Sequence, residues 1–439
     1  MPHVLTAAAA RLGILMAALA ALAAATLSGC EPDQARAASA SPDSAMVRDT
    51  ARAVLPPRAP LTTDEAARYR EIARAAWQYF NANYQPETGL VNAVPSFPYT
   101  TLWDVGGQLL AFVSARDLGL IDDATLKAKV GKTLSTLEHV QLFEDIAFNR
   151  FYSTKDASLA AKEGVGVSAT DLGRLLVALH VVASRYPDLA GAARRVVSRN
   201  DFKQLVKDGY LQGYAVSEGK RWAFQEGRIG YEQYIATGFS SWGAAVSPAL
   251  TVKSNAENAT VLGVPVLADK RGNDRLLSEP FILYGVELGL SNELDDLAQR
   301  VLRAQEARFT QTGIVTVASE DAVAIKPYYF YYYCVLCNDK PFVIGVSSPR
   351  TVLDSPRWVS TKAAYGWDAL YPSDYTKKAV DYVQPSFDAK RGWASGVFES
   401  NRASTETYEI NTAAVLLEVA AYQLRGRVPL VDAAPSSAR

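Results

Sequence analysis

The sequence predicts an all-α fold of the (α/α)6 type, a toroid in which six inner helices are enclosed by about six outer helices. Two observations predict it. Helix-like segments of two kinds alternate along the chain, and the links between them alternate between short and long. The long loops, with short β arms, are expected on one face of the toroid, and loops on a rigid scaffold commonly carry function.

The first kind of segment is amphipathic, with apolar residues at helical spacing among charged ones. Such a helix has solvent on its back and belongs in the outer layer. The fourth outer helix is expected within Ser247–Asp274, where the pattern is poor. The other expected outer helices are Thr63–Tyr84, Asp122–Leu142, Leu189–Val206, Asn292–Phe309 and Ser373–Val383.

The second kind of segment is apolar nearly all round. A helix without a polar face must be covered on every side, so these segments belong in the inner layer. They are Thr101–Leu118, Ser168–Ser184, Tyr231–Val246, Glu279–Leu290, Trp358–Leu370 and Thr405–Leu424.

The links leaving an apolar helix are short, as in Gly119–Asp122, whereas the links entering one are long, as in Phe143–Val167. Faint repeats support the same architecture. The segment Leu118–Leu126 resembles Leu288–Leu297, and both follow an apolar helix. Repeats at uneven spacing are what a helical toroid with elaborated loops should leave behind.

The ends of the chain are expected to lie outside this domain. Met1–Gly29 is apolar and ends in small residues, which is typical of an export signal. The L-S-G-C ending resembles the bacterial lipobox and predicts lipidation of Cys30, although a plain cleaved signal remains the alternative. Glu31 follows, which by resemblance to enterobacterial sorting favours the outer membrane, on the periplasmic side. Residues 30–60 are expected to be a disordered tether, 61–426 the toroid and 427–439 a disordered tail.

The formal net charge is −1 and no block of like charge occurs, so no nucleic-acid partner is expected. The chain has no P-loop and no complete dinucleotide fingerprint, so no nucleotide is expected either. With histidine nearly absent, neither a metal nor a cofactor is expected, and acid–base chemistry falls to carboxylates or tyrosine.

Cys334 and Cys337 form a C-x-x-C pair. No thioredoxin-like pattern surrounds it, and no second pair completes a zinc site. A structural disulfide is the preferred interpretation, with two reduced thiols as the alternative.

Acids stand at the entrances of the apolar helices, which converge in a toroid on a central funnel. Asp171 fits a helix capping motif as well as a functional role, and Asp104 fits the same motif but adjoins Trp103. Glu279 could be only a favourable charge at a helix N-terminus. Glu409 enters a fully apolar helix, where an unpaired charge is costly.

The stretch Gln225–Gly243 combines acids, aromatic residues and glycines before an apolar helix. Capping explains Glu232 least, because no hydroxyl precedes it by three residues, so it is the expected general acid. Asp104 is its expected partner, with Glu409 as a further catalytic candidate. The expected substrate-binding residues are Trp103, Asp171, Glu226, Arg228, Tyr231, Tyr234, Trp242 and Glu279.

The motifs LWDVGG, EGRIGYEQY and T-E-T-Y-E-I-N-T resemble an uncharacterised bacterial family, DUF3131, over about Asp64 to Gly426. That family resembles, more distantly, glycoamylase-like (α/α)6 enzymes that act on β-linked glucans. The resemblance implies a carbohydrate-active toroid with a poly- or oligosaccharide partner, and Asp104, Glu232 and Glu409 as funnel acids.

The leading hypothesis is a lipid-anchored glycoside hydrolase that cleaves a bacterial glucan or exopolysaccharide. A polysaccharide lyase on the same fold, with a tyrosine base, is the first alternative. A non-catalytic polysaccharide-binding lipoprotein of an export system is the second.

Overall fold

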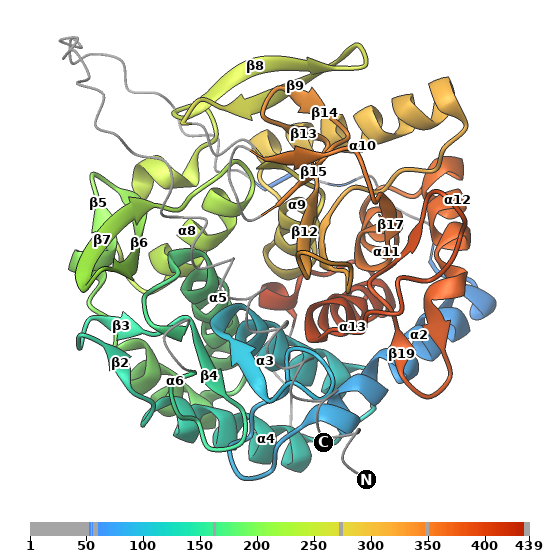
Figure 1. Cartoon of the computed structure of the whole chain (residues 1–439). Coiled ribbons are helices and arrows are strands. Elements are labelled where there is room, and N and C mark those ends of the chain that lie inside the picture. Colours follow the sequence, from blue (N-terminus) through green and yellow to red (C-terminus); the bar gives the residue numbers. More distant parts are fainter. Residues whose placement is uncertain are drawn as a thin grey trace, which may run out of the picture.

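The computed structural model describes residues 52–53, 55, 60–160, 164–271, 275–346 and 351–433 (Figure 1). The expected export signal, Cys30 and most of the expected tether lie outside the described residues.

Six helical segments of the described chain form a closed ring (Figure 1). Each packs against the next in chain order, and the last packs back on the first. The ring consists of α3 (Leu102–Asp117), α5 (Ala169–Arg185), α8 (Tyr231–Ser241), α9 (Glu279–Leu283) with its π-helical continuation η3 (Tyr284–Leu288), α11 (Thr361–Leu370) and α13 (Ile410–Leu424).

Glycines allow the inner helices to approach closely. A Cβ on Gly173 of α5 would lie 2.3 Å from the Ile235 Cβ of α8, and one on Gly238 of α8 would lie 2.4 Å from the Gly173 carbonyl oxygen. The ring helices are covered all round, as their composition predicts. On α13, every residue from Ile410 to Gln423 is buried.

Amphipathic helices surround the ring: α2 (Thr63–Asn83), α4 (Asp123–Leu137), α6 (Pro187–Val197), α10 (Asn292–Thr312) and α12 (Asp374–Tyr382). Between α8 and α9 the described residues contain no α-helix. The 3-10 turn η2 (Ser247–Leu250) and a hairpin of β8 (Ala256–Val261) and β9 (Val264–Asp269) occupy this interval, where the helical pattern is poor.

The structure is mostly helical, as expected, with 47% helix, but it also contains 20% strand in many small sheets, more than the short β arms that were expected. Most strands are two to four residues long, too short to leave an alternating pattern in the sequence. Trp358, expected to begin a helix, lies in a strand, and Thr405–Glu409 is not helical.

The remaining strands, nearly all in the long connections between outer and inner helices, are β1 (Tyr99–Thr101), β2 (Leu142–Phe143), β3 (Ala147–Phe148), β4 (Phe151–Ser153), β5 (Val206–Lys207), β6 (Tyr210–Ser217), β7 (Lys220–Gln225), β10 (Arg275–Leu276), β11 (Glu320–Ala322), β12 (Phe330–Tyr333), β13 (Leu336–Cys337), β14 (Lys340–Pro341), β15 (Ile344–Gly345), β16 (Val352–Leu353), β17 (Trp358–Ser360), β18 (Phe387–Asp388), β19 (Gly392–Trp393) and β20 (Gly396–Phe398). A four-residue helix, α7 (Phe202–Leu205), precedes β5.

The long connections enter the N-terminal ends of the inner helices, and short links leave their C-terminal ends. On the short-link side, Arg52 forms an ion pair with Asp432, and the Ala53 N–H donates to the Leu290 carbonyl oxygen over 2.8 Å. Leu430, in the short helix η5 (Leu430–Asp432), is fully buried. The described parts of the expected tether and tail therefore pack on the helical body. Within the described ranges, every helix is too short or too polar to span a bilayer.

Candidate functional site

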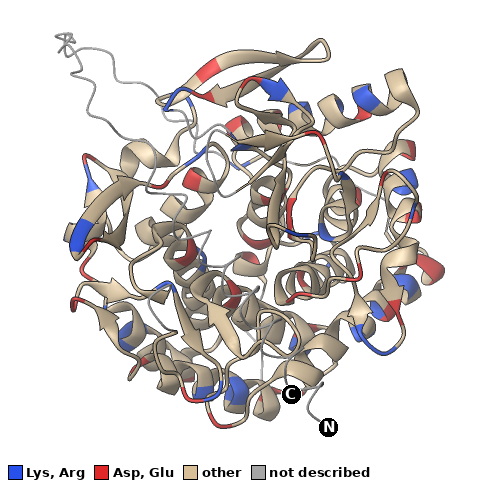
Figure 2. Cartoon of the chain, in the orientation of Figure 1, with Lys and Arg blue, Asp and Glu red and all other residues tan. Residues whose placement is uncertain are grey.

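Acidic residues recur around the middle of the ring, at the ends of the inner helices that the long connections enter (Figure 2). Lys362, at the start of α11, is the cation at the centre of one such group. Its Nζ lies 2.9 Å from Glu279 Oε2, 3.3 Å from Asp321 Oδ1 and 3.9 Å from Glu409 Oε1. The site therefore joins α9, β11, α11 and the residue before α13.

The neighbours of this lysine group hold its carboxylates in place. Asn411 Nδ2 donates to Glu279 over 2.7 Å, and Thr412 Oγ1 donates to Glu409 over 2.8 Å. Burial raises the pKa of Glu409 to about 8 against the opposing charge of Lys362, and raises that of Asp321 to about 6. Because three carboxyl groups surround a single ammonium, one of the carboxyls retains a proton near neutral pH.

Glu320, the neighbour of Asp321 on β11, pairs with a different cation. Arg228 Nη2 lies 2.7 Å from Glu320 Oε2, and the guanidinium also lies 4.3 Å from the centre of the Tyr231 ring. Burial raises the pKa of Glu320 to about 7, and Arg228 opposes that rise. Arg228, expected to bind substrate, forms a buried ion pair with Glu320.

Asp104 on α3, Asp171 on α5 and Glu226 directly after β7 form a second acidic group, and all three side chains are partly exposed. Glu226 caps α5, because its Oε1 accepts from Ser168 Oγ over 2.8 Å and its Oε2 accepts from the Ala169 N–H over 2.5 Å. In the expected capping motif the Asp171 carboxylate would accept from the Ser168 N–H. The Asp171 N–H does donate to Ser168 Oγ over 3.1 Å, and a side-chain hydrogen bond with Ser168 lowers the pKa of the Asp171 carboxyl.

Asp104 does form the expected capping box. Its Oδ2 accepts from the Thr101 N–H over 3.2 Å and from Thr101 Oγ1 over 2.9 Å. Burial raises the pKa of Asp104, while the Thr101 bonds and the charge of Arg174 oppose the rise. Burial raises the pKa of Asp171 well above its usual range, and the charges of Glu226 and Asp104 raise it further. The pKa of Asp171 is therefore raised further than that of the neighbouring Asp104.

Glu232, the expected general acid, is not accessible. Its side chain is fully buried, and Arg271 binds both carboxylate oxygens, with Nη1–Oε1 at 2.9 Å and Nη2–Oε2 at 2.8 Å. Asn255 adds a donor at 3.4 Å. On α8, Glu232 lies on a different face from Tyr231 and Tyr234, so it points to the β8–β9 segment. Its role is to attach that segment to the ring.

The expected aromatic subsites prove to be mostly interior. Trp103, Tyr231 and Tyr234 pack together, with ring centres 5.6 Å and 6.1 Å apart, and at most 8% of any of these side chains is exposed. Beneath them Arg174 lies among Glu287, Glu418 and the Trp103 ring, fully buried. Trp242 lies at the opposite end of α8, where its Nε1 donates to the Leu176 carbonyl oxygen over 2.9 Å, so it lines no part of the site.

Sequence reasoning missed Glu320, Asp321 and Lys362. The sequence offered two signals for them. Two adjacent acids lie inside the apolar run Ile314–Ile325, and a lone lysine stands at the entrance of an apolar helix. A charge in such a position requires a partner, so these residues could have been paired with Glu279 and Glu409.

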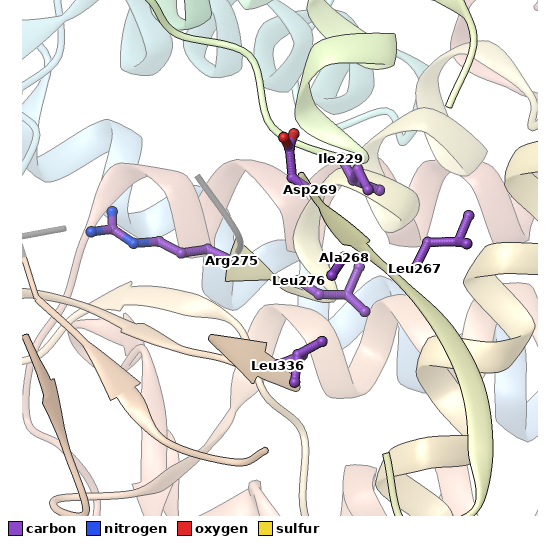
Figure 3. Close-up of a pocket in the computed structure, with 7 residues that line it drawn as sticks. All are labelled: Ile229, Leu267, Ala268, Asp269, Arg275, Leu276 and Leu336. Carbon is purple, nitrogen blue, oxygen red and sulfur yellow. The ribbon is translucent and has the colours of Figure 1, made fainter. Parts of the chain in front are cut away.

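Cys334 and Cys337 are both buried thiols, with their Sγ atoms 2.7 Å apart. The disulfide between them stays a prediction. Among the described residues, no cluster of histidine, cysteine and carboxylate side chains could hold a metal ion. The pocket in Figure 3, beside Asp269 and Arg275, is lined mainly by apolar residues and includes none of the acids described above.

Residues 71–426 match the family described as protein of unknown function, DUF3131. The chain belongs to this family. The match covers the whole ring, from α2 to the end of α13. Comparison with curated proteins finds no match.

Solved structures similar to this DUF3131 member share its fold. An endo-β-1,2-glucanase from Chitinophaga pinensis, in complex with sophorotriose and glucose, is 12% identical with a TM-score of 0.61, covering 84% of this chain and 96% of that one. A glucoamylase-like protein from Bacteroides caccae ATCC 43185 is 12% identical with a TM-score of 0.61, covering 83% and 97%. An endo-β-1,2-glucanase from Talaromyces funiculosus, in complex with sophorose, is 10% identical with a TM-score of 0.56, covering 84% and 87%.

Proposed function

We propose that this DUF3131 member is a glycoside hydrolase that cleaves a β-linked glucan. In this proposal the fold is an (α/α)6 toroid in which the β8–β9 hairpin stands where the fourth outer helix would lie. The likeness to β-1,2-glucanases supports the substrate class, and the acidic centre of the ring supports the reaction class.

The observation that carries the proposal is the state of the Asp171 carboxyl. It is partly exposed, and burial with two neighbouring carboxylates raises its pKa well above the usual range, although Ser168 and the charge of Arg150 oppose the rise. A glycosidase needs one carboxyl that is protonated and one that is ionised, set apart by their environments. Asp104, which accepts two hydrogen bonds from Thr101, is the carboxylate of that pair.

In the proposed step, Asp171 gives its proton to the glycosidic oxygen as the bond from that oxygen to the anomeric carbon breaks. Asp104 takes a proton from a water molecule, and the water oxygen bonds to the anomeric carbon. Inversion results if the gap between the carboxyls admits this water. The Arg228–Glu320 pair, with side chains 13% and 9% exposed, can donate to and accept from sugar hydroxyls, whereas the lysine group is almost fully buried.

A lyase would need a tyrosine that loses its proton readily. Burial raises the pKa of Tyr231 and of Tyr79, and nearby carboxylates raise both further, which opposes that role. The glycosidase proposal therefore has the stronger support.

The test uses purified protein with β-1,2-, β-1,3- and β-1,4-linked glucans, and measures reducing ends together with absorbance from unsaturated products. New reducing ends without that absorbance, lost in Asp171→Asn, are expected. Unsaturated products would establish a lyase instead. Binding without product over days would establish a non-catalytic carbohydrate-binding protein.

The expected location of the protein in the cell is inferred from its N-terminal residues. We propose export and lipidation at Cys30, with retention at the outer membrane. Two or more acyl chains give lasting membrane attachment. Cys30→Ser should release the protein from washed membranes and abolish incorporation of labelled palmitate. Unchanged membrane association of that variant would refute the anchor.

We also propose that Cys334 and Cys337 form a disulfide in the exported protein, because the two thiols are adjacent in space. Because both cysteines are buried, the protein is unfolded in denaturant and alkylated without reduction, and mass spectrometry should then find both unmodified. Two alkylated thiols would exclude the disulfide.

A further inference from the structure

Trp222 differs in exposure from the other tryptophans of the chain. All seven lie in described residues, and Trp222 is the exposed one, with 54% of its surface accessible. It lies on β7, in the hairpin that β7 forms with β6 at the edge of the ring (Figure 1). An exposed indole needs a reason, because burying such a side chain stabilises a fold strongly.

The register of this hairpin connects Trp222 to the acidic group. Residues two apart on a strand share a face, so Trp222, Phe224 and Glu226 point the same way. The pairing extends as far as Glu226, whose N–H donates to the Leu211 carbonyl oxygen over 3.4 Å. Glu226 caps α5 next to Asp171, so one face of β7 runs from solvent to the proposed acid.

Contacts around Phe224 confirm which face this is. A Cβ on Gly213, the residue paired with Phe224, would lie 2.6 Å from the Phe224 ring and 2.8 Å from Glu226 Oε2. The Arg150 guanidinium lies 5.8 Å from the Phe224 ring centre. The absence of a side chain at position 213 thus leaves room for the aromatic ring beside the acid.

The opposite face of the hairpin is used for packing. Arg221 forms an ion pair of 2.9 Å with Glu144 and covers the Tyr214 ring at 5.0 Å, while Tyr214 stacks on Phe143. These contacts fix the hairpin to the ring through one face; on the other face Trp222 is exposed, although its strand partner Ala215 is buried.

We infer that this face of β7 is an extended binding surface for the glucan chain, on which Trp222 stacks against a sugar ring outside the acidic centre. Same-face positions are about 7 Å apart along a strand, so Trp222 and Phe224 offer two successive apolar platforms leading to Glu226. The ligand is a β-linked glucan chain longer than the acidic centre alone contacts. The inference rests on the proposed function and adds that the protein prefers long chains to short ones.

The test compares Trp222→Ala with wild type on a long glucan and on a trisaccharide of the same linkage. KM for the long glucan should rise about tenfold with kcat unchanged, and KM for the trisaccharide should stay the same. Trp222→Tyr should restore most of the affinity. Phe387→Ala is the matched control, because Phe387 is 48% exposed on the separate β18–β19 hairpin, where its ring lies 5.1 Å from that of Trp393.

Equal changes for both substrates, or the same change in Phe387→Ala, would overturn the inference while leaving the proposed function intact. Affinity electrophoresis in gels containing the glucan gives a readout that does not need turnover. Retardation of wild type and Asp171→Asn, but not of Trp222→Ala, supports the surface even if no hydrolysis occurs. Wild type that neither binds nor cleaves any glucan overturns both proposals.

Discussion

Asp171 and Glu232 occupy similar places, each in the first turn of an inner helix. Their surroundings differ. Glu226 adds to the capping of α5 and the Asp171 carboxyl stays partly exposed, whereas Arg271 binds both oxygens of a fully buried Glu232. The comparison teaches that the partner, not the place in the helix, decides whether an acid can react or serves to hold the fold.

The largest expected effect is on turnover at Asp171. Asp171→Asn removes the proposed proton donor and should reduce kcat by about 10²–10⁴-fold, the usual contribution of a general acid. The melting temperature should stay close to that of wild type, because the asparagine amide can keep the side-chain hydrogen bond with Ser168 and removes the repulsion from Glu226 and Asp104. Release of reducing ends and thermal denaturation measure the two effects. If Asp171→Asn releases reducing ends at the wild-type rate, Asp171 is not the proton donor and does not differ from Glu232 in this respect.

Glu232→Gln should show the opposite pattern. It removes one partner of a buried ion pair and leaves Arg271 with Asp269 alone, so the free energy of unfolding should fall by about 3 kcal/mol. Turnover per folded molecule should persist. Urea denaturation measures the loss, and Glu138→Gln is the control.

In that control, the pair of Glu138 with Arg195 is largely exposed, so the loss should be below about 1 kcal/mol. If Glu232→Gln loses turnover and keeps its stability, Glu232 belongs with Asp171 after all.

A third prediction concerns the lysine group, through the pH dependence of the free energy of unfolding. Burial raises the pKa of Glu409 to about 8, above the roughly 4.3 of an unfolded glutamate. The folded chain therefore binds more protons between these values, and the free energy of unfolding should fall as pH rises from about 4.5 to about 8.

Glu409→Gln cannot ionise, so its decline between pH 5 and pH 8 should be smaller by at least about 1 kcal/mol. Urea denaturation at the two pH values measures this. Glu218→Gln, in the exposed turn between β6 and β7, should decline as wild type does. Equal declines in both variants would refute the assignment.

The smallest effect is expected at Trp242, away from all these acids. Trp242→Phe loses one hydrogen bond to Leu176 and should reduce the free energy of unfolding by about 1 kcal/mol. KM should not change. A raised KM would show that this end of α8 contributes to substrate binding.

The ring of helices was predictable because a fully apolar helix must be covered on all sides, and α13 shows this most clearly. The gap in the pattern at Ser247–Asp274 also corresponds to a real departure from the helical plan. The strands were not predictable, because segments such as Glu320–Ala322 contain too few residues to show a period.

The site was predictable only in part. Asp104, Asp171, Glu279 and Glu409 do gather at the ends of the inner helices that the long connections enter, as the helix entrances suggested. The pairing of Glu232 with Arg271 could not be foreseen, because the two residues are 39 positions apart and the loop between them has no regular pattern. Glu226 likewise reaches α5 from a separate hairpin, 58 positions from Ser168.

The two ends of the described domain meet on the short-link face, where Arg52 pairs with Asp432 and Ala53 with Leu290. Adjacent ends at a surface tolerate rejoining and fusion. The domain is therefore suited to circular permutation, with residue 433 joined to residue 52 and a new break in an exposed loop. It is equally suited to immobilisation on a support through either end, with the acid-lined face directed outward.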